Sequence, residues 1–447
     1  MLASKADYEV VVVGGGIAGL TAAYRLRDHR VLVLEAADTA GGRVKSHQRG
    51  RYWVNLGAQF LAGEGPLWDL AQELGIESLS LRQSQPALAL KNKLVVSEVP
   101  ARFAVELPLS PAGRVAMLRL GLKLRRTYKR LARNRDREDA RRFRDRLDAV
   151  SSSEYFGGIR NEEVQAILRA LIRFWMGAEP EEVCAGHTAL YIGLSVANLG
   201  EVPPFSLVVG GNQEIPRTLA RNLGDRIRTE AMVSEVRARG EVVEIRFKQN
   251  GREETVTARE CVIAVPAYAV LDIVPDLSEP KRRALEAVRY GAYVTVGFFT
   301  TELGSQPWDK IYVATVVDKT FQVLVNPATV LHQGADRPPG GALLLYAGGD
   351  PARKLLELSD SEIVRTFQTD LEALFPSLRG HIEETVVQRW PKAIPYWEPG
   401  GRALKEALRE SSGHIHFAAD YLAYPSMQVA ATAGTEVAKI VAPRLAD

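Results

Sequence analysis

Four residues near the N-terminus have the types and spacing of a dinucleotide-binding loop. Gly14, Gly16 and Gly19 form the pattern G-x-G-x-x-G, and Glu35 follows Gly14 by 21 residues. In such a loop the first glycine permits a tight turn, the second lets the backbone approach a pyrophosphate, and the third allows close helix–strand packing. A carboxylate at this distance accepts hydrogen bonds from ribose hydroxyls and repels a 2′-phosphate. The pattern therefore indicates a dinucleotide without a 2′-phosphate.

The elements that must position these residues are indicated by the flanking apolar runs. Residues 10–13 and 31–34 are continuous aliphatic runs, typical of strands buried on both faces of a parallel sheet. Between them, apolar residues recur at helical spacing as far as Leu26. The N-terminus of this helix, with its free backbone N–H groups and positive dipole end, is expected to face the phosphates. Strand, helix, strand and terminal acid together predict a βαβ dinucleotide-binding unit.

A second glycine pair follows the acid. Gly41-Gly42-Arg43 precedes a strand-like run at residues 52–60. Here the sequence resembles the flavin amine oxidase, protoporphyrinogen oxidase and phytoene desaturase superfamily, whose members carry a G-G-R-x-x-S/T element and then a strand ending in D-x-G-A. The resemblance implies FAD, because a second glycine pair admits its long pyrophosphate and ribityl chain and Arg43 supplies a fixed cation. Asn55 stands where relatives usually carry Asp.

The resemblance recurs at two later segments where this superfamily contacts FAD. Val233 matches the valine whose backbone contacts the adenine, and Asp420 matches the acid beside the pyrophosphate and ribityl chain. Met427 begins a helix whose N-terminus would point at the flavin O2 edge. Ala419 and Val429 replace glycines of the relatives. The cofactor-binding residues that the resemblance implies are Gly14, Gly16, Ile17, Ala18, Gly19, Glu35, Gly42, Arg43, Gly57, Ala58, Gln59, Val233, Trp390, Asp420 and Met427.

The expected fold class is α/β, with a Rossmann-like FAD-binding domain interleaved with an α+β substrate domain. The chain of 447 residues is long enough for two or three domain-sized units. The FAD-binding domain is predicted to comprise residues 1–85, 205–290 and 385–447. The substrate-binding domain is predicted to comprise residues 86–204 and 291–384.

The two inserts differ in their predicted secondary structure. The first is mainly helical, whereas in the second, residues 292–300 and 342–346 have the pattern of strands. Residues 359–375 have the spacing of an amphipathic helix. Ser359 is its expected N-cap and Glu362, three residues later, completes a capping box.

No catalytic residue can be assigned from the sequence. Amine oxidases of this superfamily usually place a lysine near flavin N5, in the strand matching residues 290–297, where this chain has Val296 or a near neighbour and no lysine. They also flank the flavin with two aromatic rings, one of which falls where this chain has Ser426. Residues 388–396 instead resemble the R-W-x-x-A-x-P-x-Y element of the protoporphyrinogen oxidase branch.

These departures favour removal of a hydride from an apolar or polycyclic small molecule, by C–C or C–N dehydrogenation, with transfer to flavin N5. O2 or another acceptor is expected to reoxidise the flavin. Tyr396, Trp397 and Ser426 are the candidate substrate-pocket residues. One alternative is an amine or amino-acid oxidase that lacks the usual lysine. Another is a non-catalytic prenyl-binding protein of the same fold.

Composition excludes several function classes. The 57 basic and 54 acidic residues give a net charge of +3, which is not that of a nucleic-acid-binding protein. Cys184 and Cys261 form no disulfide framework, and neither lies in the C-terminal flavin-facing segment, so we expect noncovalent FAD and a cytoplasmic location. No signal peptide or membrane span is predicted. His187 follows Cys184 at helical spacing without a third ligand nearby, so no metal site is expected.

One segment departs from this even charge balance. Residues 114–146 carry densely spaced arginine and lysine, with Val115, Leu118 and Leu122 among them. We favour a solvated helical face that nearby acidic residues partly neutralise. The alternative is peripheral contact of this segment with a membrane surface.

Overall fold

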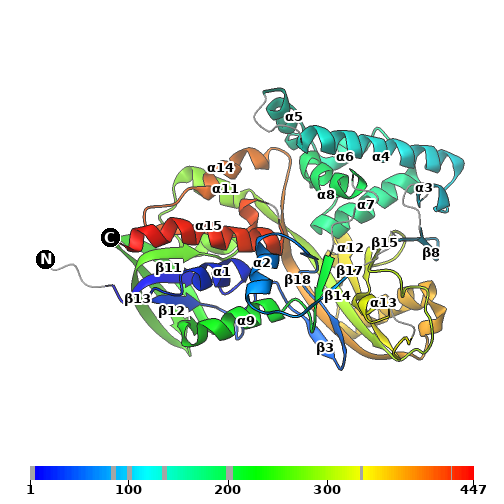
Figure 1. The fold of residues 1–447 in the computed structure, drawn as a ribbon. Coiled ribbons are helices and arrows are strands. Elements are labelled where there is room, and N and C mark those ends of the chain that lie inside the picture. The colour runs from blue at the N-terminus through cyan, green and yellow to red at the C-terminus, as the bar shows by residue number, and fades with distance from the viewer. Residues whose placement is uncertain are drawn as a thin grey trace.

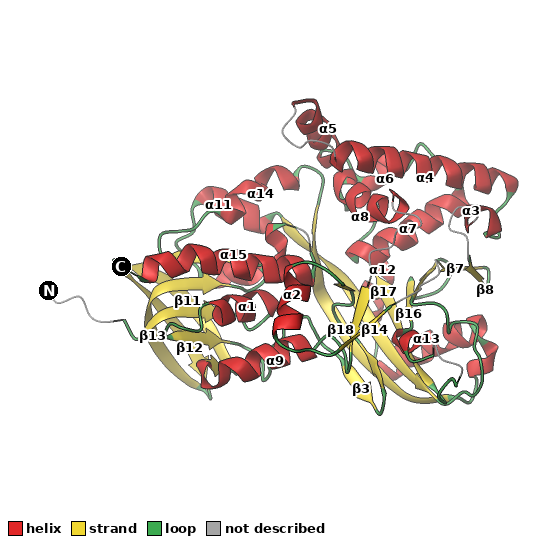
Figure 2. Cartoon of the chain, viewed as in Figure 1, coloured by secondary structure: helices red, strands yellow, loops and turns green. Residues whose placement is uncertain are grey.

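The computed structural model describes residues 6–81, 87–97, 103–132, 138–197, 205–332, 336–423 and 425–446. Two large sheets, each of seven strands, lie side by side with helices packed around them (Figures 1 and 2). A group of helices lies beyond the second sheet. This arrangement confirms the predicted α/β fold class.

The first sheet contains the predicted βαβ unit. Its strand order is β10-β2-β1-β13-β12-β11, and β19 pairs with β13. The pairs β1–β2, β1–β13, β2–β10 and β13–β19 are parallel, whereas β11, β12 and β13 are antiparallel. The strands are β1 (Tyr8–Val13), β2 (Val31–Leu34), β10 (Ile227–Arg228), β11 (Ala231–Arg239), β12 (Val242–Gln249), β13 (Arg252–Ile263) and β19 (Ile415–Phe417). The two aliphatic runs of the sequence are the adjacent central strands β1 and β2, and all their valines and leucines are buried.

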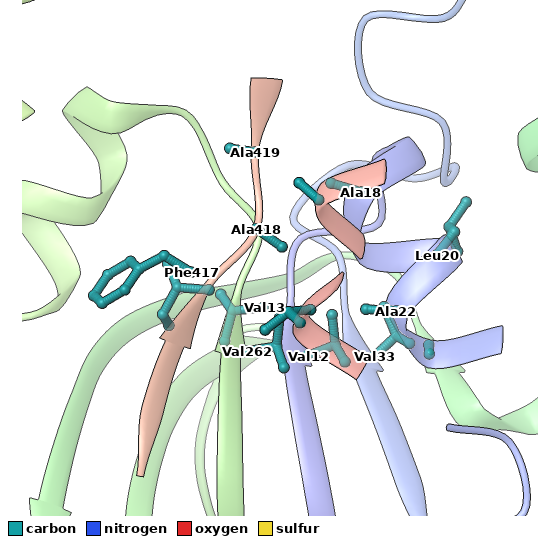
Figure 3. Close-up of a cluster of buried hydrophobic side chains, with 14 of the residues drawn as sticks. Val12, Val13, Ala18, Leu20, Ala22, Val33, Val262, Phe417, Ala418 and Ala419 are labelled. Atoms are coloured by element: carbon teal, nitrogen blue, oxygen red, sulfur yellow. The ribbon is translucent and has the colours of Figure 1, made fainter. Parts of the chain in front are cut away.

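Helices cover this sheet. They are α1 (Ile17–Arg25), α2 (Pro66–Glu73), α9 (Glu214–Leu223), α10 (Ala267–Ile273), α11 (Glu279–Glu286), α14 (Lys405–Arg409) and α15 (Met427–Leu445). Helix α1 lies between α9 and α15. The approach of α15 to α1 requires a glycine, because a Cβ at Gly434 would lie 2.3 Å from the carbonyl oxygen of Ala18. Figure 3 shows the core beneath α1, where Val12, Val33 and Val262 lie close together.

The second sheet has strand order β18-β14-β17-β16-β15-β7-β8. Its strands are β7 (Ala87–Leu90), β8 (Lys93–Val96), β14 (Val288–Thr300), β15 (Val313–Val316), β16 (Val323–Val325), β17 (Gly341–Gly348) and β18 (Ile382–Trp397). One face packs on α12 (Asp350–Leu355) and α13 (Asp360–Leu374). The capping box of α13, formed by Ser359 and Glu362, is confirmed, as are both strands predicted in the second insert.

Two small sheets cover the other face of the second sheet. One pairs β3 (His47–Arg49) with β4 (Tyr52–Val54), and the other has the order β5-β9-β6, in which the strands are Leu61–Ala62, Phe205–Val208 and Ser78–Ser80. Tyr52, Trp53 and Val54 of β4 pack directly against this face. The small sheets therefore bring the chain that follows the second glycine pair between the two large sheets.

The first insert is mainly helical, as predicted. Its helices are α3 (Phe103–Glu106), α4 (Pro111–Ala132), α5 (Glu138–Asp148), α6 (Ser152–Phe156), α7 (Glu162–Met176) and α8 (Ala185–Ala197). They enclose a separate apolar core that includes Leu120, Leu168 and Ile172. Helix α4 lies on the outer edge of this group (Figure 1). In the described part of the chain, no helix combines the length and apolarity needed to cross a bilayer.

The strands of each large sheet come from widely separated parts of the chain. The first sheet uses strands between residues 8–34, 227–263 and 415–417, and the second uses strands between residues 87–96 and 288–397. The proposed domain boundary at residue 385 falls inside β18, which pairs with β14 in the second sheet. The division of the chain into domains at the stated residues stays a prediction.

A buried carboxylate joins the C-terminal segment to the first sheet. Glu260 of β13 accepts hydrogen bonds from His416 of β19 (2.6 Å), His414 (3.0 Å) and Arg444 of α15 (2.9 Å). Burial opposes ionisation of this carboxyl group, but the three partners outweigh that effect and lower its pKa to about 2. Glu260 is therefore a charged group that stabilises the folded chain near neutral pH.

Replacing Glu260 with glutamine is expected to lower the stability of the protein by about 3 kcal/mol at pH 7. Because the folded-state pKa lies below the unfolded value, this contribution is complete above about pH 4.5 and is lost as the pH falls towards 2. Thermal unfolding of E260Q and wild type across this range measures it. The control is Glu254→Gln on the same strand, whose partnership with Arg228 is exposed. A Tm difference between wild type and E260Q that is the same at pH 7 and pH 3 would contradict the assignment.

Candidate cofactor site and substrate cavity

One continuous cavity of about 3290 Å³ runs through the middle of the molecule. At one end it is lined by the loops that follow β1, β2 and β13. From there it continues past the start of α15 to the second sheet and the helices α7 and α8. Its length and its two differently built ends suit an elongated cofactor beside a separate substrate chamber.

The glycine loop has the geometry of a phosphate cradle. Gly14 adopts φ +105°, and a Cβ there would lie 2.8 Å from the carbonyl oxygen of Ala264. A Cβ on Gly19 would lie 1.9 Å from the carbonyl oxygen of Gly14, so this glycine permits close packing and does not line the cavity. Gly16 has open space on the side of its absent Cβ. The loop thus leaves room for a group at the N-terminus of α1, where Ile17 and Ala18 also line the cavity.

Glu35 stands at the end of β2, on the cavity wall. Its carboxylate accepts hydrogen bonds from the backbone N–H groups of Gly15 (2.6 Å) and Ala37 (2.8 Å). These bonds fix the carboxylate directly beside the glycine loop. Val233 of β11 lines the same end of the cavity. The structure therefore brings the acid and the valine together with the glycine loop at one end of the cavity.

Arg43 and Asp420 form an ion pair on the cavity wall, although 377 residues separate them. The guanidinium donates to Asp420 Oδ1 (2.8 Å) and to the carbonyl oxygen of Ala393 (2.6 Å). Burial lowers the pKa of Arg43, but the charge of Asp420 more than offsets this, so the pKa lies above its ordinary value. Gly42 adopts φ +57° beside Gly16. The Arg43–Asp420 ion pair therefore holds the Arg43 guanidinium close to the glycine loop.

The N-terminus of α15 also faces the cavity. Ser426 is its N-cap, and the Ser426 hydroxyl accepts a hydrogen bond from the Val429 N–H (3.1 Å). Ser426, Met427 and Ala419 line the cavity. The 19-residue helix directs its positive dipole end into this part of the cavity, where it favours negative charge.

The loop that carries Gly57, Ala58 and Gln59 passes along the cavity, and all three residues line it. We call this segment the central loop. A Cβ on Gly57 would lie 2.1 Å from the carbonyl oxygen of Arg43, so only glycine fits. The carbonyl oxygen of Leu56 accepts two hydrogen bonds, from Trp390 Nε1 (2.8 Å) and from Thr295 Oγ1 (2.9 Å). Trp390 lines the cavity beside this loop.

Asn212 is a buried residue that the sequence did not identify as part of the site. Its side-chain amide donates to the carbonyl oxygens of Ala58 and Gln59 (both 3.0 Å). Its backbone N–H donates to Asn55 Oδ1 (2.8 Å), which also accepts from Ser46 Oγ (2.8 Å). Asn212 is a positioning residue for the central loop. The only sequence signal was its place after two glycines.

Strand β14 alternates between the cavity and the opposite core. Tyr293 lines the cavity and Thr295 reaches the central loop, whereas Val294 and Val296 are buried against α12 and α13. The position nearest the loop is therefore Thr295, the near neighbour of Val296, and β14 contains no lysine. Lys310, in an exposed loop, is the one lysine among the described residues that line the cavity.

An aromatic chamber forms the far part of the cavity. Trp175 stacks on Phe174 with ring centroids 4.6 Å apart, and it lies 5.6 Å from Phe60 and 5.9 Å from Tyr191. Phe60 lies 6.2 Å from Tyr312. We call these five residues the aromatic chamber; all line the cavity. These residues were not predicted from the sequence, because they come from four separate segments and only Phe174 and Trp175 are adjacent.

Two tyrosines that line the cavity, Tyr312 and Tyr346, form hydrogen bonds with the central loop and the residues just before it. Tyr312 accepts a hydrogen bond from Gln59 Nε2 (2.7 Å), and Tyr346 donates to the carbonyl oxygen of Asn55 (2.8 Å). Burial raises the pKa of both phenols above the ordinary value. Both hydroxyls therefore stay protonated and neutral at physiological pH.

Two of the three candidate substrate-pocket residues lie elsewhere. Tyr396 is 4% exposed and packs in the core of the helical group, and Trp397 is 5% exposed and packs in the core of the first sheet. Neither lines the cavity, whereas Ser426 does. The last residues of β18 no longer line the cavity but pack into these two cores. Proximity to Trp390 in the sequence therefore does not place Tyr396 and Trp397 in the cavity.

Comparison with known proteins agrees with this architecture. The profile of the family "Flavin containing amine oxidoreductase" matches residues 17–442. An L-amino-acid oxidase from Siganus canaliculatus is 24% identical over 96% of this chain and 85% of its own. A putative flavin-containing monoamine oxidase, AofH, from Mycobacterium tuberculosis is 31% identical over 58% of this chain and 57% of its own.

Solved structures show the same fold. A cyclohexylamine oxidase from Brevibacterium oxydans superposes with a TM-score of 0.82 at 20% identity, covering 99% of this chain and all of that chain. Putrescine oxidase superposes with a TM-score of 0.80 at 18% identity, covering 98% of this chain and 99% of that chain. With the family profile spanning nearly the whole sequence, this chain belongs to the flavin-containing amine oxidoreductase family and is an FAD-dependent enzyme of the amine oxidase superfamily.

Proposed function

We propose that this enzyme oxidises an apolar amine, removing a hydride from the carbon that bears the nitrogen and leaving an iminium ion, which becomes an imine by losing a proton to water. The observation that carries the proposal is the continuity of one cavity between a phosphate cradle and the aromatic chamber. The chemistry that FAD would supply there is acceptance of the hydride at N5 and its transfer, as electrons, to O2 or another acceptor.

The residues that would hold FAD follow from the geometry of the cavity. The glycine loop and the N-terminus of α1 would bind the pyrophosphate, and Glu35 the ribose. Arg43 would balance the phosphate charge while Asp420 fixes its guanidinium. The α15 N-terminus would favour negative charge on the isoalloxazine ring. Gly57, Ala58, Gln59 and Trp390 would then lie beside this ring.

Noncovalent binding of FAD is supported by the positions of the two thiols. Cys184 and Cys261 are free and buried, and neither lines the cavity. Burial raises the pKa of the Cys184 thiol to about 12, so its reactive thiolate is not populated. A covalent bond between FAD and a cysteine of this chain would require either thiol to leave its core.

The aromatic chamber supports an apolar substrate. Its rings exclude water and supply large apolar surfaces, against which a hydrocarbon or aromatic group can pack. The neutral phenols of Tyr312 and Tyr346 are engaged with the central loop. These residues would orient the amine and keep the reacting carbon dry. Three of the five chamber residues, Phe60, Phe174 and Trp175, carry no group that gains or loses a proton.

The charges of the cavity favour an amine over an α-amino acid. A bound amino acid needs a cation for its carboxylate. The arginine and lysine side chains among the described residues lining the cavity are Arg43, Arg337 and Lys310, and Lys310 lies in an exposed loop outside the aromatic chamber. Arg43 is paired with Asp420, and Arg337 with Glu302 (2.7 Å) and Asp309 (2.8 Å). Neither guanidinium is available without breaking a pair that is at least partly buried.

The relatives also bear on the substrate. Their names include monoamine, cyclohexylamine, putrescine and L-amino-acid oxidases. They support the amine or amino-acid oxidase alternative over the dehydrogenation of a polycyclic molecule that the sequence analysis favoured. An L-amino acid is the second candidate substrate, because the L-amino-acid oxidase aligns with 96% of this chain.

Anaerobic bleaching of the flavin tests this proposal. Phenethylamine and L-phenylalanine differ only by a carboxylate, so together they isolate its effect. We expect phenethylamine to bleach the flavin at least tenfold faster than L-phenylalanine at equal concentration. Faster bleaching by L-phenylalanine would instead establish the amino-acid alternative. Bleaching by a porphyrinogen and by neither of the two amines would overturn the proposal and restore the original expectation.

A further inference from the structure

Three large aliphatic side chains are exposed in a row on α4. Val115 is 49% exposed, Leu118 55% and Leu122 50%. Their spacing of three and four residues places them on one face of the helix. A fourth, Val105 of the adjacent α3, is 56% exposed. The described residues include ten exposed large hydrophobic side chains of any kind, so four of the ten gather on these two helices.

The same helix carries a concentrated positive charge. Its 22 residues contain seven basic side chains and no acidic one. In the described part of the chain, no acidic side chain forms an ion pair with any of the exposed ones, which are Arg114, Arg119, Arg125, Arg126, Lys129 and Arg130. The neighbouring α5 has four basic and four acidic side chains, so its charges balance. The excess charge is therefore restricted to α4.

The inner and outer faces of α4 are sharply separated. Ala116, Leu120, Leu124 and Leu131 are buried and pack within the helical group, largely against α8. On the outer face, the three aliphatic side chains form a central row, which we call the apolar row. Helical spacing places Arg119 and Arg126 along one side of it and Arg114 and Arg125 along the other. This combination characterises helices that lie in a membrane interface.

We propose that the outer face of α4 docks on an anionic lipid surface, with the apolar row inserted among the acyl chains and the basic side chains contacting phosphates. The charge argues against a second copy of this chain, because a two-fold contact would bring the same unpaired cations face to face. The apolar row argues against nucleic acid, whose backbone offers nothing to cover three exposed aliphatic side chains. An anionic bilayer satisfies both features.

The position of α4 gives this docking a consequence for the cavity. Helix α4 packs on α7 and α8, which carry Trp175 and Tyr191 of the aromatic chamber. Figure 1 shows α4 at the outer edge of the molecule, with these helices between it and the second sheet. One layer of helices thus separates the proposed membrane contact from the chamber. Docking would hold that chamber close to a source of apolar molecules.

Co-sedimentation of the purified, flavin-loaded protein with vesicles tests the proposal. We expect binding at low salt to phosphatidylcholine vesicles that contain phosphatidylglycerol, and little binding to pure phosphatidylcholine. The triple variant V115S/L118S/L122S should bind at least tenfold more weakly. The variant R119Q/R126Q should bind about 25-fold more weakly, since each cation near an anionic surface contributes about fivefold.

Matched variants elsewhere provide the controls. Ile440→Ser removes an aliphatic side chain of similar exposure (52%) on α15. R217Q/R221Q removes two exposed arginines from α9. Both should bind like wild type, and all variants should keep their flavin and Tm, because the altered side chains are exposed. No binding to anionic vesicles, or binding that both α4 variants leave unchanged, would overturn the proposal. It would also be overturned by a wild-type dimer that dissociates in the triple variant.

Discussion

Replacing Arg43 with methionine is expected to abolish retention of FAD. The side chain lies at the centre of the cavity wall and ties Asp420 to the loop after the second glycine pair. Asp420 is 7% exposed, so removal of its partner leaves a buried, uncompensated carboxylate beside the proposed phosphate site. That charge would repel the pyrophosphate and costs about 3–5 kcal/mol by itself. The visible flavin absorbance that remains after desalting measures the effect.

A second substitution separates binding of FAD from folding. The double variant R43M/D420N removes the buried charge as well, so its Tm should recover towards that of wild type while its FAD content stays low. Arg25→Met is the matched control, because Arg25 pairs with Glu73 where both side chains are about one-third exposed. It should bind FAD normally. Stoichiometric FAD in R43M would contradict the proposed place of the phosphates.

The phosphate end of the site could be predicted from sequence because its signals are local. One βαβ unit contains the three glycines, the helix N-terminus and Glu35 within residues 8–35. The backbone conformation there dictates the residue type. For example, a Cβ on Gly19 would lie only 1.9 Å from the carbonyl oxygen of Gly14, so only glycine fits. Such requirements depend little on the rest of the chain. The Arg43–Asp420 contact was reached only through resemblance, since 377 residues separate its members.

The chemistry of β14 could not be predicted at the level of single residues. Whether Thr295 or Val296 faces the central loop depends on strand register, and a one-residue shift exchanges the two faces. The pairing of β14 with β18 contains such an irregularity between Gly291 and Tyr293. The sequence marks it only by Gly291, whose Cβ would lie 1.8 Å from the carbonyl oxygen of Met176. The residues around Gly291 in the sequence do not reveal that Met176 lies next to it in the fold.

Long-range packing explains the errors at the substrate end. Tyr396 and Trp397 follow a cavity residue, Trp390, along one strand, yet they enter two different hydrophobic cores. The residues that do form the chamber come from α7, α8 and the loops before β5 and β15. Their side chains meet only when the helical group packs on the second sheet. No periodicity in the sequence encodes that meeting.

Replacing Trp175 with alanine is expected to lower kcat/KM for an aromatic amine by about 10- to 150-fold, the equivalent of the roughly 1.5–3 kcal/mol that burial of a large apolar side chain contributes. Trp175 contacts both Phe174 and Tyr191 and is only partly buried, so the variant opens the chamber without removing a core residue. Steady-state kinetics with phenethylamine measure the loss.

A small substrate and a second tryptophan provide the controls for this variant. Methylamine cannot reach across the chamber, so its kcat/KM should change by less than about threefold, well under 1 kcal/mol. Trp68→Ala removes a partly buried tryptophan of α2 that packs on the first core and lies outside the cavity lining. It should alter Tm but not the ratio of the two specificity constants. Because that ratio compares two substrates on one protein, loss of folded or flavin-loaded enzyme cancels from it. If W175A leaves the ratio of the two specificity constants unchanged, the aromatic chamber does not contribute to substrate recognition.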